Sequence, residues 1–453
     1  MPFCFILNLF IIKKLETLEV EIVNPNAAGI DIGSRENYVA INDNKSDVVV
    51  FGVYECDYKA LSDHLKQNGI TIVAMEATGS YWQTLYHHLE TAGFSVKLAS
   101  SKTMKNPKGK TDKLDCLWLR KLLTLGMLEA SFIPEPTIEK IRQFTRYRNT
   151  MVEERSACAN RIQKFLHQLN IRLDVAFSDV MGASSLRILN AILDGERNAD
   201  VLVELVEKTV KQSKDEIKKA LAGNWREELL FLIKDQLMFC KSIDGSIERA
   251  EKQIELILGS IPSAPNKVDL PTLTKKKLQK GQYKINVSQL SYDYFGVDLM
   301  QIEGIAHNTV RSIISEVGRD IHKFKTAKQF VSWLRLAPNN KISGGKILSN
   351  RTPKSKNNLA IAFRNAANTI AQKKEGMLKT FFSRIAYRKG RGAAITATAR
   401  KLGVIVWNMV MKLENYMPLQ QADYIEKIRL NTIKNMQKTI NKLNINTNEL
   451  KFS

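Results

Sequence analysis

Cysteine and histidine are scarce in this chain, which has five cysteines and six histidines among 453 residues. The cysteines are scattered and form no CxxC pair (Cys4, Cys56, Cys116, Cys158 and Cys240). The histidines form no HxxxH-type pattern. This distribution excludes a disulfide framework and the common zinc sites, and it is typical of reduced thiols in a cytoplasmic protein.

Long apolar runs are also missing. The run Phe3–Ile12 is too short to span a bilayer, because a transmembrane helix needs about 20 apolar residues. Its lysines follow the run, whereas a secretory signal peptide carries them in front. We therefore expect no membrane association. Residues 1–25 are an N-terminal extension for which a strand, a packing arm and a segment outside the working fold are all open.

Acidic residues are outnumbered, since 46 Asp and Glu stand against 68 Lys and Arg, a formal net charge of +22. The excess is concentrated, with fifteen Lys and Arg and a single acid (Glu375) between residues 341 and 410. A concentrated basic segment indicates a polyanionic partner, and nucleic acid is the usual one. The 44% hydrophobic content suffices for two or three globular domains.

The first part of the chain alternates between strand and helix patterns. Apolar runs predict five strands, and amphipathic stretches predict three helices interleaved with the later strands. The predicted order is strand 27–33, strand 37–43, strand 47–53, helix 57–68, strand 70–78, helix 81–91, strand 94–100 and helix 112–125. Thr111 is a predicted N-cap of the last helix. The pattern indicates an α/β domain over residues 26–130.

The rest of the chain has mainly helical patterns. Apolar residues recur every three or four positions, which predicts long amphipathic helices and favours a coiled coil. These stretches are 138–169, 186–193, 201–221 and 227–258. Three prolines mark 260–272 as a linker. We therefore expect a helical, coiled-coil segment (131–290), a mostly helical domain (291–420) and a basic tail (421–453) that forms a frayed helix.

Four acids occupy positions where they can meet. Asp31 closes the first predicted strand and Glu76 the fourth, while Asp112 and Asp115 are three residues apart on one face of the last helix. Clustered carboxylates repel one another unless a cation lies between them, and hard oxygen ligands suit Mg²⁺ or Mn²⁺. Two such ions can activate a nucleophile on a phosphodiester and stabilise its leaving oxygen.

Each of these features also has a simpler interpretation. Asp31 can be a turn residue and Glu76 a surface residue at a strand end. The acids of the DxxD pair can form local ion pairs with the lysines around them. The aromatic pair Tyr81 and Trp82 can stack on a base, or pack in the core beneath the helix that it begins.

Six blocks of the chain resemble a known family, the DEDD-type (Piv-like) transposases and invertases of bacterial insertion sequences. They occur in the family's order over roughly residues 25–415. The blocks are GIDIGSRENYVAI (29–41), MEATGSYWQTLYHHLETAGFSVKLAS (75–100), KNPKGKTDKLDCLWLRKLL (105–123), NIRLDVAFSDVMGASSLRILNAILDGER (170–197), LAPNNKISGGK (336–346) and FFSRIAYRKGRGAAITATARKLGVIVWNMV (381–410).

This resemblance implies a RuvC-like domain of the RNase H fold that holds Mg²⁺ or Mn²⁺ on Asp31, Glu76, Asp112 and Asp115. It implies a C-terminal transposase domain whose essential serine matches Ser343. Members recombine double-stranded DNA at specific sites, and several are guided by a structured bridge RNA. They assemble through the helical segment, so a homo-oligomer (dimer or tetramer) is expected, acting at the nucleoid in the cytoplasm.

The neighbours of Ser343 suit a nucleophile, although Ser-Gly-Gly alone is usually a flexible turn. Gly344 and Gly345 let a backbone approach a phosphate closely, and Lys341 and Lys346 place positive charge beside it. No histidine or aspartate is nearby in sequence to act as a base, so activation is expected from the four acids and their metal. Other cations expected at phosphates are Lys102, Lys105, Lys108, Lys110, Arg351, Lys354, Lys356 and Arg364.

The segment 299–318 resembles the family's helix-hairpin-helix, which would grip DNA through a glycine-containing turn. Glu303 and Ala306 replace the proline and glycine common there, so a plain amphipathic helix pair is an equal alternative. Three functions stay open for the chain: a recombinase with a serine–phosphate intermediate, a metal-dependent junction-resolvase-like nuclease, and a nucleic-acid-binding remnant. The presence of all five candidate side chains argues against the remnant.

Overall fold

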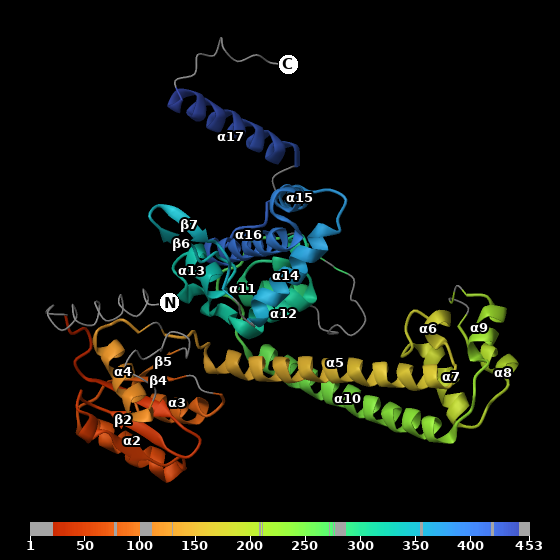
Figure 1. Ribbon diagram of the computed structural model, residues 1–453, viewed down its shortest axis with the longest axis horizontal. Helices are drawn as coiled ribbons and strands as arrows, with labels where there is room; N and C mark the ends of the chain where they lie inside the picture. Colours follow the sequence, from red (N-terminus) through yellow and green to blue (C-terminus); the bar gives the residue numbers. More distant parts are fainter. Residues whose placement is uncertain are drawn as a thin grey trace. The chain divides into compact units, whose positions relative to one another are not determined.

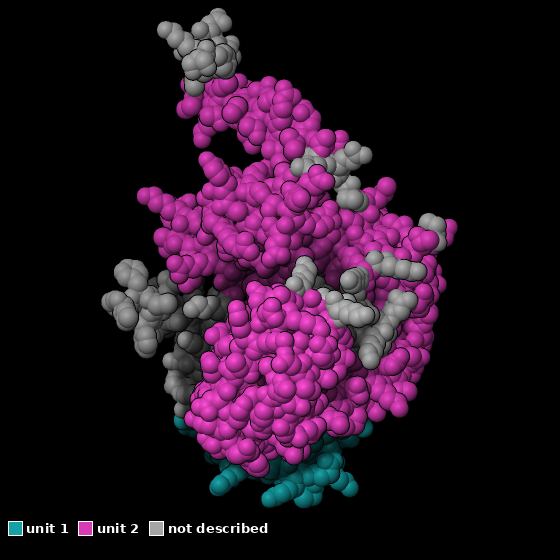
Figure 2. Space-filling model, turned by 90° about the vertical axis from the view of Figure 1, so that its right-hand side faces the viewer, with its two compact units in different colours: residues 1–133 teal, residues 134–453 magenta. Residues whose placement is uncertain are grey.

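The computed structural model describes residues 21–76, 79–99, 111–128, 130–207, 210, 212–270, 272–274, 276, 287–353, 357–417 and 421–443. The chain divides into two compact units, unit 1 up to Ile133 and unit 2 from Pro134 onward. Figure 2 colours unit 1 teal and unit 2 magenta. In the described part of the chain, no helix is long and apolar enough to cross a membrane.

Unit 1 is built on a five-stranded sheet in the order β3-β2-β1-β4-β5. The first three strands form an antiparallel meander, with a short 3-10 helix before β3, and β4 and β5 run parallel to β1. All five predicted strands are therefore confirmed. The strands are β1 (Ala27–Ile32), β2 (Asn37–Ala40), β3 (Val49–Phe51), β4 (Ile72–Glu76) and β5 (Ser95–Ala99).

Helices cover both faces of this sheet (Figure 1). On one face, large side chains such as Ile30 and Met75 pack against α2 (Glu55–Gln67) and α3 (Trp82–Thr91). On the other face, the small residues Ala27 and Ala74 pack against α4 (Asp112–Thr124). Small residues on the α4 side leave room for this helix to lie close to the strands.

Two long helices dominate the first part of unit 2. The helices α5 (Pro136–Gln168) and α10 (Glu227–Ser260) lie side by side along their length (Figure 1). They are antiparallel: Arg148 Nε donates to Glu251 at 2.6 Å, and further along α5 the Cys158 thiol donates to the carbonyl of Gln236 at 3.1 Å. The long helices predicted over 138–169 and 227–258 are confirmed.

A small helical cluster joins the ends of α5 and α10 and has its own apolar core. Its helices are α6 (Leu173–Ala176), α7 (Ala183–Leu193), α8 (Ala199–Glu204) and α9 (Lys214–Leu221). The single helical stretch expected over 201–221 is wrong, because it is two helices. The hydroxyl of Ser213 accepts from Glu216 N and the Glu216 carboxylate accepts from Ser213 N, a capping box that starts a new helix.

The remainder of unit 2 is mostly helical, as predicted, around the long helix α16. Within the described ranges the elements are α11 (Val287–Phe295), η2 (Leu299–Gln301), α12 (His307–Glu316), η3 (Gly318–Lys323), α13 (Ala327–Trp333), β6 (Lys341–Ser343), β7 (Lys346–Ser349), α14 (Asn358–Ala371), α15 (Met377–Lys389), α16 (Arg391–Lys412) and α17 (Gln421–Lys442). The proline-rich linker is docked on α11: Ala264 N donates to Asp293 O and the Tyr292 hydroxyl donates to Val268 O.

Candidate active site

Asp31 and Glu76 lie beside each other at the carboxyl ends of the neighbouring strands β1 and β4. The strands β1 and β4 pair in parallel, with Ile30 opposite Met75, and each acid is the next residue of its strand. Side chains alternate between the faces of a strand. Asp31 therefore shares its face with Ala27 and Gly29, which is the face that α4 covers.

Gly29 determines how close α4 comes to β1. A Cβ atom at this position would lie 2.2 Å from the carbonyl oxygen of Cys116 and 2.4 Å from the backbone nitrogen of Arg120. Both distances are far below van der Waals contact, and both neighbours are backbone atoms of α4 that cannot swing aside. The helix therefore rests directly on the strand that carries Asp31.

The first turn of α4 carries the DxxD pair. Thr111 is the N-cap, as predicted, and its hydroxyl accepts from Leu114 N. Asp112 is exposed and Asp115 half-buried. Acids in a first turn stabilise a helix by interacting with its dipole, so this position gives the pair a structural role as well as a place near the sheet edge.

All four predicted acids line one cavity of about 560 Å³. The remaining lining comes from the end of β1, the loop to β2, and Tyr38. The acids of this cavity act on the same neighbouring group. A hydrogen bond to Glu36 raises the pKa of the Tyr38 hydroxyl, and the charges of Asp112 and Asp31 act in the same direction. Burial, with Asp31 adding to it, raises the pKa of the neighbouring Cys116 thiol to about 12, so this cysteine stays protonated.

Arg35 is a cavity residue for which the sequence pattern predicts no role. It is exposed in the loop between β1 and β2 and is one of the residues that line the acidic cavity. The loop is tight, since Gly33 N donates to Glu36 O at 2.9 Å. Its only signal in the sequence is its position four residues after Asp31. A cation at this place is suited to a phosphate that approaches the carboxylates.

The carboxylates of this cavity suit a divalent metal ion, but their arrangement does not form a coordination sphere. Carboxylate oxygens are the ligands that Mg²⁺ and Mn²⁺ prefer, and here the four predicted acids and Glu36 line one cavity. Among the described residues, however, no three His, Cys, Asp or Glu side chains form a group that could hold a metal ion as they stand. A bound ion would therefore require these side chains to move toward one another.

Ser343 lies at the tip of an exposed β-hairpin in unit 2. The strands β6 and β7 are antiparallel, with Ser343 opposite Lys346, so Gly344 and Gly345 form a two-residue loop. Their φ angles are +53° and +73°, as a type I′ turn requires at both positions. The sequence leaves a flexible turn open here, whereas the structure has a defined hairpin that presents the serine and both lysines to solvent.

The predicted phosphate-binding cations are only partly described. Lys341 and Lys346 flank the turn, Arg351 follows β7 and lines a separate cavity, and Arg364 is half-buried on α14. The remaining six fall outside the described residues: Lys102, Lys105, Lys108, Lys110, Lys354 and Lys356. In unit 1, Trp82 packs against the core and meets Tyr86 edge-to-face, whereas Tyr81 is exposed.

The expected helix-hairpin-helix contains a turn but lacks a full first helix. The turn follows the short η2 and has Gly304 at φ +78°, where a Cβ atom would lie 2.7 Å from the carbonyl oxygen of Ala366. The turn therefore packs on α14. A plain helix pair is equally wrong, because three residues of 3-10 helix replace the first helix.

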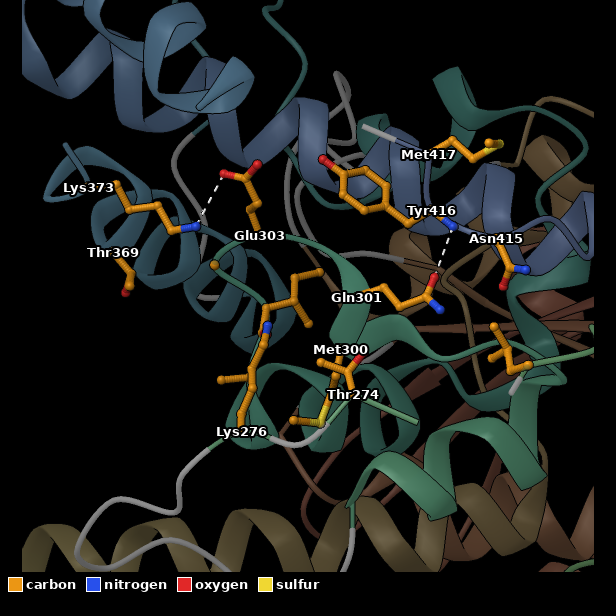
Figure 3. A pocket seen from close by; sticks show the side chains of 14 residues that line it. Thr274, Lys276, Met300, Gln301, Glu303, Thr369, Lys373, Asn415, Tyr416 and Met417 are labelled. Atoms are coloured by element: carbon orange, nitrogen blue, oxygen red, sulfur yellow. Dashed lines mark hydrogen bonds and ion pairs between the residues drawn. The ribbon is translucent and has the colours of Figure 1, made fainter. Parts of the chain in front are cut away.

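A cavity of about 760 Å³ borders this turn (Figure 3). The ammonium group of Lys276 donates to the carbonyl oxygens of Ile302 and Ile305, and burial lowers its pKa to about 8. Glu303, which also lines the cavity, pairs with Lys373 at 3.3 Å. The carbonyl oxygens of the turn already accept hydrogen bonds from Lys276, and the carboxylate of Glu303 lines the cavity. This turn is therefore poorly suited to hold a DNA phosphate.

Comparison with known families matches two regions of the chain. Residues 28–171, which include all four acids, match a profile of DEDD-type transposases described as "Transposase". Residues 298–383, which include Ser343, match the "Transposase IS116/IS110/IS902 family". No curated protein matches the chain. The DEDD-type match indicates dependence on a divalent metal. The chain therefore belongs to the IS110 family of transposases and is a DNA transposase/recombinase.

Proposed function

We propose that this enzyme cuts and rejoins double-stranded DNA through a transient bond between Ser343 Oγ and a DNA phosphate. The observation that carries the proposal is that Asp31, Glu76, Asp112 and Asp115 line a single cavity. In the first step Ser343 Oγ bonds to phosphorus while the bond to one DNA oxygen breaks. The serine proton passes to a carboxylate of this set and from there to the DNA oxygen that leaves, which becomes a hydroxyl. A DNA hydroxyl reverses these transfers when the strand is rejoined.

The proposed cofactor is Mg²⁺ or Mn²⁺, held by the same four carboxylates. When bound, such an ion supplies positive charge beside the attacked phosphate. Arg35 would position a phosphate oxygen at the cavity wall. The glycine loop after Ser343 would let the DNA backbone approach the hydroxyl closely.

We infer that unit 1 has a RuvC-like, RNase H-type fold. Its support is the mixed sheet, with an antiparallel meander followed by two parallel strands, and acids at the ends of β1 and β4. We keep the division into a catalytic domain (26–130), a helical segment for oligomerisation (131–290), a transposase domain (291–420) and flanking segments. A bridge RNA, a homo-oligomer and action at the nucleoid in the cytoplasm remain parts of this proposal, supported by the resemblance and the excess positive charge.

The test is a search for a covalent protein–DNA adduct with the full-length protein, its co-purified RNA and DNA carrying the element ends. We expect an adduct that requires Mg²⁺, disappears on adding EDTA, and is absent in Ser343→Ala and Glu76→Gln. Ser349→Ala, on the same hairpin, is the matched control and should keep the adduct.

One alternative has a structural argument of its own, since all four acids belong to unit 1 and Ser343 does not. A junction-resolvase-like nuclease would use the acids with a water molecule. It would give free 5′-phosphate ends, with no protein attached, and equal cleavage by the wild type and Ser343→Ala. That outcome would overturn the serine mechanism while preserving the role of the acids.

A further inference from the structure

A groove of about 1030 Å³ lies in unit 2 between the base of the β6–β7 hairpin and the helices α15 and α16. From α16 it is lined by residues at steps of three and four, from Ala393 to Val404, so one face of the helix forms its floor. α15 contributes a second face with Phe381, Ile385 and Arg388. No function discussed above uses this groove.

The charge around the groove has one sign. Five of its lining residues are cations, and no carboxylate lines it among the residues that the structure describes. The cations are Arg351, Arg388, Lys389, Arg400 and Lys401. A concave surface with this much positive charge attracts a polyanion, and arginine side chains are well suited to bind phosphate groups.

Between these cations, the floor of the groove is mostly apolar and it is open. Small residues of α16, such as Gly392 and Ala393, keep the space free, and Ile347 from the hairpin is 62% exposed. Duplex DNA presents phosphates and hides the faces of its bases. An apolar floor beneath a cationic rim instead suits a single strand, whose bases need apolar or aromatic contact while its phosphates need cations.

Lys401 shows that the inner end of the groove is partly dry. Its ammonium group lies 4.6 Å from the centre of the Phe381 ring and 3.3 Å from the sulfur of Met377. Burial lowers its pKa, and the nearby charges of Arg384 and Lys427 act in the same direction. A phosphate placed here would supply the anionic partner that this desolvated cation favours.

We propose that this groove binds an extended single strand of nucleic acid, with phosphates on the cationic rim and at least one base on the apolar floor. The proposal rests on the proposed function in one respect, the delivery of a strand to Ser343. Ile347, which lines the groove, pairs with Ile342, and the next pair of the hairpin is Ser343 with Lys346. A strand in the groove would thus lie beside the element that carries the nucleophile.

Binding is tested by fluorescence anisotropy with full-length Ser343→Ala protein in EDTA, so that catalysis plays no part. The probes are a labelled 12-nucleotide single-stranded DNA, the same sequence as RNA, and the DNA duplex. We expect the double variant Arg388→Glu/Lys389→Glu to weaken single-strand binding about tenfold or more, because phosphate contacts are lost. Lys434→Glu/Lys438→Glu, with the same charge change on exposed positions of α17, should weaken it less than about threefold.

A second variant separates the groove from general charge. Ala393→Phe fills the floor from an exposed position, and it should weaken binding of the single strands while leaving duplex binding unchanged. The tighter of the two single-strand probes identifies DNA or RNA as the source. Equal losses in both charge-reversal variants, or no effect of Ala393→Phe in a folded protein, would overturn the proposal. If no Ser343–DNA adduct formed, the proposed function would fail, but the single-strand affinities measured here would be unchanged.

Discussion

Gly29 is the residue on which the geometry of the acidic cavity depends most directly. It lies two positions before Asp31, and the backbone of α4 covers it at Cys116 and Arg120. In Gly29→Ala the new methyl group would push α4 away from β1. We expect a loss of unfolding free energy of about 1–3 kcal/mol, as for other overpacked sites, together with loss of metal-dependent DNA cleavage because Asp112 and Asp115 move with the helix.

Thermal unfolding of the full-length protein and the cleavage assay measure these two effects. Gly259→Ala is the matched control, because it lies near the end of α10 and a Cβ atom there would meet nothing within 4 Å. It should stabilise the helix slightly, by at most about 1 kcal/mol. A Gly29→Ala protein with unchanged melting temperature and activity would show that α4 does not rest on β1 as described.

At this scale the sequence predicts positions better than contacts. Asp31 and Glu76 could be placed at strand ends because apolar runs stop there, and parallel strands bring such ends together. The role of Gly29 could not be predicted, because it depends on backbone atoms almost ninety residues later in the chain. Arg35 is not predicted for a related reason: only the folded loop brings this residue to the cavity that the carboxylates line.

The β6–β7 hairpin is the element that presents Ser343, and its turn is the feature to test. Both loop glycines have positive φ, and a Cβ atom at either would meet nothing within 4 Å. Backbone conformation, rather than space, therefore requires glycine. Gly344→Asn should retain adduct formation, because asparagine adopts this conformation readily in type I′ turns. Gly344→Val should lose most of it, since the strain of about 1–2 kcal/mol is large for an exposed two-stranded hairpin.

Adduct yield on element-end DNA measures this effect, and the melting temperature should change little because the hairpin is exposed. Equal adduct yields from the asparagine and valine variants would mean that the turn does not position the serine.

Among the elements, helices with a clear apolar period are predicted by the sequence, including the shorter α2, α3, α4 and α7; the exceptions are an interrupted repeat and a single 3-10 turn. The apolar repeat of α5 and α10 continues for more than eight turns, so its period is unambiguous. The repeat over 201–221 is interrupted by the capping box at Ser213, a signal that periodicity alone conceals. The 3-10 helix η2 was likewise missed, because three residues are too few to show a period.

For the whole molecule, the sequence predicts the kind of partner and the fold of each part, because composition and local patterns determine them. It places the acids in one unit and the serine in the other without predicting how a reaction would unite them. In the proposed mechanism that union would depend on DNA and on other copies of the chain, neither of which leaves a local pattern in one sequence.

The uneven charge of the whole chain predicts strongly salt-dependent DNA binding. Each cation that displaces a counterion from duplex DNA contributes about 0.9 to the slope of log K against log salt concentration. Lys341 and Lys346 are exposed beside Ser343, so Lys341→Gln/Lys346→Gln should reduce the slope by up to about 1.8. Anisotropy titrations at several salt concentrations, in EDTA, measure it. Lys214→Gln is the control, since Lys214 belongs to the helical cluster α6–α9 and already pairs with Glu204 at 2.6 Å. An unchanged slope in the double variant would mean that the DNA backbone does not contact the serine hairpin. Ser343 could then not be the nucleophile.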